Sequence, residues 1–180
     1  MTPASKVEHV TVRAPEAPSG GAELKVTSST FQAGGTIPDP VAFGGCGGKN
    51  VSPQLSWSGA PSGTKSFALT CFDPDAPTGS GFWHWVVANI PARVTSLDEN
   101  AAVNGLPAGV VEGFTDYGVS HWGGPCPPPG DAPHRYIFTI YALDLPAIEG
   151  ASPTLGGARL VFSMRGHLLA KGSIEGRYGR

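Results

Sequence analysis

The sequence has few charged residues and no cluster of basic ones. Only 14% of its 180 residues are Asp, Glu, Lys or Arg, and the formal net charge is −2. Proteins that bind nucleic acid or an anionic membrane surface usually carry a basic patch or stripe. We therefore predict that the protein binds neither nucleic acid nor an anionic membrane surface.

Long hydrophobic runs are also absent. No stretch of 18 apolar residues occurs, and so we predict that no segment spans a membrane. Residues 1–21 contain Lys6, Glu8 and Arg13 but lack the apolar core of a secretory signal. We interpret them as a flexible N-terminal tail ahead of one domain, residues 22–180. The expected location is cytoplasmic, with reduced thiols.

Cysteine is scarce, and its odd number excludes a fully paired disulfide framework. The chain has three cysteines and no Cys-x-x-Cys pair, so we expect no structural zinc site, no other metal and no cofactor. Cys71 lies within an apolar run and is interpreted as a small buried hydrophobic residue. The roles of Cys46, which glycines flank on both sides, and of Cys126 stay open.

Sequence signatures of catalysis are missing as well. The chain contains no Gly-x-Ser-x-Gly nucleophile elbow and no His-Glu-x-x-His metal motif. Ser80 stands near the residues discussed below, but nothing in the sequence marks it as activated. We therefore predict a protein that is not an enzyme.

Glycine and proline, in contrast, are abundant. The chain has 26 glycines and 18 prolines, while 40% of its residues are hydrophobic, which indicates a turn-rich β fold rather than disorder. Its length fits one domain with a sizeable core. Helical spacing from Ser152-Pro153 to about residue 170 predicts one helix, and Gly166 within it suggests close packing on the sheet. Strands are predicted at 23–27, 51–57, 67–72, 85–90, 110–117, 134–143 and 173–178.

The segment Asp73-Pro-Asp-Ala-Pro lies between two of these apolar runs. The two-residue period of a strand places Asp73 at the end of one apolar face. In the next strand the same period places His84 on one face with Val86 and Ala88. Because the two strands are neighbours in sequence, we expect Asp73 and His84 at adjacent strand ends, where a pocket with convergent polar groups would form.

A second segment of the same character, residues 123–133, is too rich in Pro and Gly to form a helix or a sheet ladder. It leads into the strand 134–143, in which His134 and Tyr136 point to one face. Arg135 points to the opposite face, and we expect it to pair with a carboxylate or a carbonyl. His121 precedes this segment and is predicted near the pocket, without a defined role.

These motifs, DPDAP, then Trp-His before Val-Val-Ala-Asn, then GGPCPPPGDAPHRY, resemble the phosphatidylethanolamine-binding protein family. The resemblance covers roughly residues 22–180 and is strongest to the bacterial and archaeal branch, often labelled Raf-kinase-inhibitor-like. It implies a mainly β fold, an antiparallel two-sheet β sandwich with one helix of the C-terminal region packed on it, and a small anion-binding pocket at one end of a sheet. Carried over by motif, the ligand-binding residues are Asp73, His84, Gly124, Pro125, Cys126, Pro127, His134 and Tyr136.

These residue types suit a phosphate group. Two imidazoles, the Tyr136 hydroxyl and the backbone N–H groups of Gly124 and Cys126 can donate hydrogen bonds. Asp73 is expected to orient an imidazole or to meet an ammonium group, because a carboxylate repels a phosphate dianion. We predict a non-enzymatic binding module for phosphate-bearing anions, such as phospholipid head groups or nucleotides. The resemblance adds regulation of partner proteins such as kinases, and it is compatible with a homodimer.

Alternatives to this prediction stay open. One acid and two histidines also resemble the two-His, one-carboxylate metal set, or a base pair for hydrolysis. The family also includes protease-inhibitor and protein-interaction modules. The histidines could be buried structural residues, and Asp73 and Asp75 could be turn formers. The Ala76-Pro77 bond could be cis. Vertebrate members continue with a helix over the pocket, and we expect no such lid after Arg180.

Overall fold

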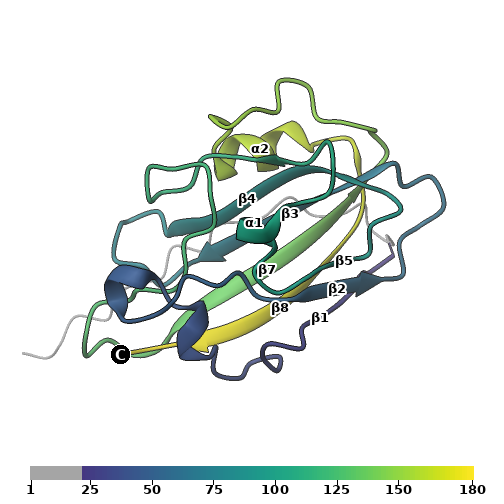
Figure 1. Ribbon diagram of the computed structural model, residues 1–180. Coiled ribbons are helices and arrows are strands. Elements are labelled where there is room, and N and C mark those ends of the chain that lie inside the picture. The colour runs from purple at the N-terminus through teal and green to yellow at the C-terminus, as the bar shows by residue number, and fades with distance from the viewer. Residues whose placement is uncertain (1–21) are drawn as a thin grey trace, which may run out of the picture.

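A computed structural model describes residues 22–180, and the predicted tail lies outside these residues. The described chain forms two antiparallel sheets (Figure 1). The five-stranded sheet has the order β6-β4-β3-β7-β8, and the three-stranded sheet has the order β1-β2-β5. The mainly β, two-sheet fold expected from the sequence is confirmed. The strands are β1 Lys25–Thr27, β2 Leu55–Ser58, β3 Ser66–Asp73, β4 Phe82–Pro91, β5 Ser96–Leu97, β6 Val111–Glu112, β7 His134–Leu143 and β8 Leu168–Tyr178.

Helical segments are short. The α-helices are α1 Ala101–Asn104 and α2 Gly157–Ser163, and two 3-10 turns, η1 Asp39–Val41 and η2 Gly44–Cys46, precede β2. Figure 1 shows α2 lying along the five-stranded sheet, away from β1, β2 and β5. In the part of the chain described, no helix combines the length and apolar character needed to cross a membrane.

The main core fills the space between the two sheets. Alternate residues of β3 and β7, such as Leu69 and Phe138, meet Leu55 and Trp57 of the three-stranded sheet. Trp57 contacts Phe67 edge to face, with ring centroids 5.6 Å apart. A second apolar cluster lies on the other face of the five-stranded sheet, beneath α2. This second cluster comprises Ala68, Val86, Ala88, Tyr141, Leu143, Ile148, Leu155, Leu160, Met164 and Leu168.

A β-bulge changes the predicted alternation of β4. Cys71 pairs with Trp85 and Phe72 pairs with Trp83, so His84 is an extra residue between them. The prediction that Val86 and Ala88 share the face of His84 is therefore wrong. Those two residues lie under α2. The His84 ring instead faces the inter-sheet core, where its centroid lies 5.0 Å from that of the Tyr136 ring.

The helix is shorter than its hydrophobic spacing predicts. It ends at Ser163, and Leu168 already begins β8, which pairs with β7 through Leu143. Gly166 has a φ of +82°, a left-handed conformation that ends the helical turn. The close packing on the sheet comes instead from Gly157, where an added Cβ would lie 2.3 Å from the Trp83 ring.

Candidate functional site

Asp73 and His134 meet where β3 ends and the adjacent strand β7 begins. His134 Nδ1 and Asp73 Oδ2 are 2.8 Å apart, and the two residues are only 4% and 2% exposed. Asp73 Oδ1 accepts hydrogen bonds from the N–H groups of Asp75 and Ala76, at 2.8 and 3.1 Å. Burial raises the pKa of the Asp73 carboxyl, and the His134 hydrogen bond opposes that rise. Asp73 is thus both a turn former and the residue that orients the His134 imidazole.

His84 sits on the β4 bulge and faces the segment 122–127, which we call the wall segment. Its Nδ1 lies 2.7 Å from the carbonyl oxygen of Gly123. A carbonyl can only accept a hydrogen bond, so Nδ1 carries the proton, and Nε2 of the neutral ring keeps a lone pair. Burial lowers the pKa of His84 to about 4, which keeps the ring neutral at pH 7. Nε2 has no hydrogen-bond partner within residues 22–180.

Tyr136 completes the cluster, and its hydroxyl is unusual. The residue is fully buried, and within the described residues its hydroxyl forms no hydrogen bond of acceptable geometry. The Cys126 N–H approaches this hydroxyl. Burial raises the pKa of Tyr136, so the hydroxyl is neutral and can donate. An unpaired buried hydroxyl costs stability, so this hydroxyl has hydrogen-bonding capacity that no group of the described chain uses. The indole N–H groups of Trp57 and Trp122 are unpaired in the same way.

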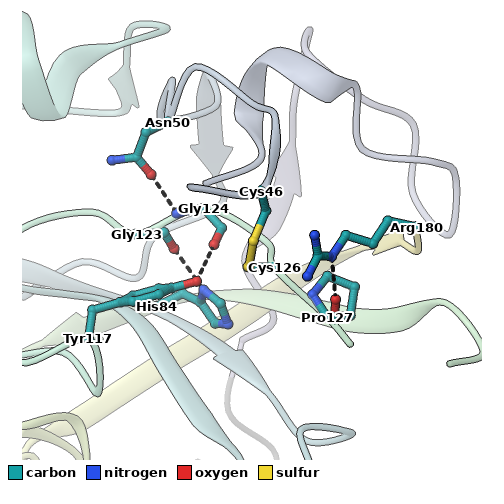
Figure 2. Close-up of a disulfide and its surroundings, with 9 residues drawn as sticks. All are labelled: Cys46, Asn50, His84, Tyr117, Gly123, Gly124, Cys126, Pro127 and Arg180. Carbon is teal, nitrogen blue, oxygen red and sulfur yellow. Dashed lines mark hydrogen bonds between the residues drawn. A yellow bond between two sulfur atoms is a disulfide. The ribbon is translucent and has the colours of Figure 1, made fainter. Parts of the chain in front are cut away.

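The wall segment is held by residues distant in sequence (Figure 2). Asn50 Oδ1 accepts the Gly124 N–H at 2.7 Å, and Asn50 Nδ2 donates to the Trp122 carbonyl at 3.1 Å. Tyr117 donates its hydroxyl hydrogen to the Gly124 carbonyl at 2.7 Å. The prediction that the Gly124 N–H is available to an anion is therefore wrong. A Cβ at Gly124 would lie 2.0 Å from the Val41 carbonyl oxygen, so only glycine fits this position.

The prolines of the wall segment also serve structure. The Pro125 carbonyl accepts the Phe43 N–H at 2.9 Å, and the Pro127 carbonyl accepts Arg180 Nε at 2.7 Å. Since proline has no N–H, the Cys126 amide is the one backbone donor of residues 124–127 without a hydrogen bond of good geometry in the described chain.

Two of these supporting residues had no recognisable signal in the sequence. Asn50 follows the glycine-rich turn and adopts a left-handed φ of 57°. The Tyr117 ring stacks on Phe43 at 4.5 Å and meets the His84 ring edge-on at 5.5 Å. Both contacts bridge segments that only the folded chain brings together, so no local motif could predict them.

A cavity of about 840 Å³ opens beside the cluster. It is bounded by the loop 74–81, by residues 131–135 and by Arg177, and His134 is the cluster residue that lines it. His134 Nε2 lies 3.5 Å from Asp131 Oδ2, so this side of the ring faces a carboxylate as well. The volume is within the range of small-molecule sites, and a ligand in this cavity would reach the cluster at His134.

Arg135, on the opposite face of β7 from Tyr136, forms an ion pair with Asp75, and both residues line the same cavity. Arg135 Nε and Nη2 contact the two Asp75 carboxylate oxygens at 2.8 and 2.7 Å, and the Arg135 N–H donates to Asp75 Oδ2 at 2.9 Å. This geometry confirms the expected pairing of Arg135 with a carboxylate. His121 lies 3.3 Å from Glu112 Oε2, beside β6, and does not join the cluster.

The cysteines depart from expectation. Cys46 and Cys126 form a disulfide with a Cα–Cα distance of 5.7 Å, so the expectation of reduced thiols is wrong for these two residues. Cys71 is free and buried, as predicted. The disulfide joins the glycine-rich turn to the wall segment (Figure 2). Residues 22–180 contain no cis peptide bond, so Ala76-Pro77 is trans.

Comparisons with known proteins agree with this geometry. Residues 27–179 match the profile of the family described as phosphatidylethanolamine-binding protein. The UPF0098 protein YbhB of Escherichia coli K12 is 44% identical over 162 residues, which cover 86% of this chain and 99% of that protein.

Solved structures show the same likeness. The crystal structure of E. coli YbcL, described as a new member of the mammalian PEBP family, matches with a TM-score of 0.84 and 44% identity. That match covers 88% of this chain and 99% of the other. A PEBP homologue from Chlamydia trachomatis matches with a TM-score of 0.76 and 32% identity, over 88% of this chain and 98% of the other.

Proposed function

Because the chain belongs to the phosphatidylethanolamine-binding protein family, we propose that it binds small phosphate-bearing anions without converting them. One observation carries the proposal. Side chains from β3, β4 and β7 converge around the Tyr136 hydroxyl, which is buried without a hydrogen-bond partner in the described chain. A phosphoryl oxygen can accept the hydrogen bond that this hydroxyl does not donate within the described chain.

The protonation state of His84 specifies which phosphate form fits. At neutral pH its Nε2 can only accept a hydrogen bond, because Nδ1–H is committed to the Gly123 carbonyl. A phosphate monoester, with a second pKa near 6, still carries a P–OH group in part of its population that can donate to Nε2. Its unprotonated oxygens accept from Tyr136 and from the Cys126 N–H. A sulfate ion offers no such proton, so the site selects phosphate over sulfate at neutral pH.

His134 links this anion site to the cavity. Its Nδ1 is committed to Asp73, and its other side lines the space of about 840 Å³. The group esterified to the phosphate, either ethanolamine as in phosphoethanolamine or a nucleoside, occupies this cavity. Asp131, which is close to His134 Nε2, suits a ligand that carries an amine on this side.

Hydrolysis is the second candidate activity, and the geometry favours it less. The Asp73–His134 pair has the arrangement of an oriented general base, and Ser80 lines the same cavity. In the part of the chain described, however, no hydrogen bond joins the Ser80 hydroxyl to His134. Within the same residues, no three His, Cys, Asp or Glu side chains are grouped so that they could hold a metal ion.

Other parts of the prediction rest on the family alone. Regulation of partner proteins such as kinases, protease inhibition and a homodimer stay proposals without a contact surface that supports them. The cytoplasmic location also stays a prediction, and the Cys46–Cys126 disulfide counts against it, because stable disulfides are rare in reducing compartments.

A titration with two anions tests the proposed function. Inorganic phosphate and sulfate are added separately to isotope-labelled protein at pH 7, and backbone and histidine ring signals are followed by NMR. We expect phosphate to shift the signals of His84, His134 and Cys126, and to bind more tightly than sulfate. Phosphoethanolamine and a nucleoside monophosphate then distinguish the two ligand sources. Shifts confined to a distant surface would refute the proposal, and release of p-nitrophenol from p-nitrophenyl phosphate would favour hydrolysis.

A further inference from the structure

The Cys46–Cys126 disulfide joins the candidate site to a turn 80 residues away in sequence. The Cys126 N–H approaches the Tyr136 hydroxyl, so the disulfide is attached to the residue that supplies one of the proposed anion donors. Figure 2 shows the disulfide beside the part of the wall segment that contacts His84. The contacts that hold Cys126 in place therefore bear on the site.

The hydrogen bonds of the wall segment lie on either side of Cys126 and not on it. Upstream, Asn50, Tyr117 and the Phe43 N–H bind the backbone of residues 122–125. Downstream, Arg180 binds the Pro127 carbonyl through Nε and accepts the Gly130 N–H at 3.0 Å through its own carbonyl oxygen. Apart from the approach of its N–H to Tyr136, the Cys126 backbone has no hydrogen-bond partner within residues 22–180. The Pro125 carbonyl lies in the same planar peptide unit as the Cys126 N–H, so the Phe43 hydrogen bond helps to orient this amide. The disulfide adds the constraint on the Cys126 side chain, and it joins that side chain to the turn that follows Phe43.

The opposite end of the disulfide lies in a glycine-rich turn, residues 44–48, in which Gly48 packs closely against Ala42. Two glycines flank Cys46 on each side, and the neighbouring Gly44, Gly45 and Gly47 are exposed. Glycine has the largest conformational freedom to recover when a constraint is released. Within the turn, only short-range backbone hydrogen bonds to Phe43 and Gly44 remain once the cross-link is broken.

Both disulfide cysteines are accessible, and the third cysteine is not. Cys46 and Cys126 are partly exposed, whereas Cys71 is fully buried between the sheets. Burial also raises the pKa of the Cys71 thiol, which suppresses the thiolate needed for exchange. A small dithiol can thus reach the Cys46–Cys126 bond without interference from the remaining thiol.

We propose that the Cys46–Cys126 disulfide, together with the hydrogen bond from Phe43 N–H to the Pro125 carbonyl, positions the Cys126 amide as an anion donor, so that phosphate affinity depends on thiol oxidation. The proposal rests on the proposed function and adds control of the same site. A dithiol reductant breaks the S–S bond in two exchange steps. The two protein sulfurs gain two electrons and two protons, and the reductant becomes a cyclic disulfide. Reduction frees the Cys126 side chain from the turn, so the amide is held toward the anion by the Phe43–Pro125 hydrogen bond alone and loses affinity.

The test compares the oxidised full-length protein with the same protein reduced by dithiothreitol. Thiol titration under denaturing conditions should count one thiol before reduction and three after it. We expect phosphate to bind the oxidised form about 10- to 100-fold more tightly, the range for loss of one charge-assisted hydrogen bond. Phosphate should shift the Cys126 amide signal in the oxidised form alone, and re-oxidation should restore binding. Cys46→Ser should behave like the reduced protein, and Cys71→Ala should keep the full redox response.

A second measurement covers the case in which the reduced protein loses its fold. Because phosphate favours the oxidised form, saturating phosphate should slow reduction of the wild-type protein by dithiothreitol, and it should not slow reduction of Tyr136→Phe. Equal phosphate affinity of folded oxidised and reduced protein, with no protection from reduction, would overturn the proposal. If neither form binds phosphate, the proposed function itself fails, and the redox control fails with it.

Discussion

The two halves of the candidate site are built in different ways. Asp73, His84, His134 and Tyr136 stand on β3, β4 and β7, whose ladders fix their backbones, with His84 on the bulge of β4. The wall segment has no ladder of its own. It depends on single hydrogen bonds from residues such as Asn50, 72 and 74 residues away, and on one disulfide. The strands of the sheet therefore position the side chains of the site. Single long-range hydrogen bonds and one disulfide position the backbone of the wall segment opposite them.

If this contrast holds, the largest loss of stability should come from a tight contact of the wall segment. In Gly124→Ala the new methyl group meets the Val41 carbonyl at 2.0 Å, so the backbone must move. We expect a loss of about 3 kcal/mol or more in the free energy of unfolding, measured by urea denaturation. Gly44→Ala, where nothing lies within 4 Å of the added Cβ, should change it by less than about 0.5 kcal/mol. Equal effects would contradict the tight contact at Gly124.

The next largest loss of stability is expected when the two hydrogen bonds from Asn50 to the wall segment are removed. Asn50→Gly keeps the left-handed backbone conformation, which glycine adopts freely, and removes both hydrogen bonds to the wall segment. We expect a loss of about 2–3 kcal/mol, because the Gly124 N–H and the Trp122 carbonyl are left unpaired. Asn100→Gly is the matched control, since Asn100 has a φ of 63° and its side chain caps nothing. A comparable loss in Asn100→Gly would assign the effect to the backbone instead.

A pH experiment tests the half of the site that stands on β3, β4 and β7, which we call the strand-borne half. The pKa of His84 is about 4 in the folded protein and near 6.5 when unfolded, so the unfolded state binds the extra proton between these values. The stabilisation is complete above pH 6.5 and is lost as the pH falls toward 4. Between pH 7 and 5 this one group should lower the free energy of unfolding by roughly 2 kcal/mol.

His84→Gln provides the comparison, because its loss of stability between pH 7 and 5 should be smaller by about that amount. Denaturant unfolding at both pH values measures the difference. An identical pH dependence in the two proteins would show that His84 does not titrate in this window.

The sequence predicted the strand-borne half well. The bounds of β7 agree with the alternation over 134–143, and the opposite faces of Tyr136 and Arg135 follow from the same period. The pairing of Arg135 with a carboxylate follows from its place beyond the apolar face. In these strands each local preference agrees with the fold, and so local reasoning suffices.

The rest of the site depends on features without a local signal. The bulge at His84 adds one residue to a ladder, and periodicity alone cannot locate it. The spacing of Leu160, Met164 and Leu168 satisfies a helix and equally serves α2 followed by β8. Asn50 and Cys46 hold the wall segment although they lie far from it in the sequence, and a single sequence does not show which distant residues meet in the fold.

The most direct test of the account removes one oxygen atom. Tyr136→Phe deletes the hydroxyl that is unpaired in the described chain, so the free energy of unfolding should stay within about 1 kcal/mol of wild type or rise slightly. Phosphate affinity at pH 7 should fall about 10- to 100-fold. The control is Tyr141→Phe. The Tyr141 hydroxyl contacts Thr70 Oγ1 at 3.5 Å on the α2 side of the sheet, so this variant should bind phosphate like wild type. Unchanged phosphate affinity in a stable Tyr136→Phe protein would contradict the central claim.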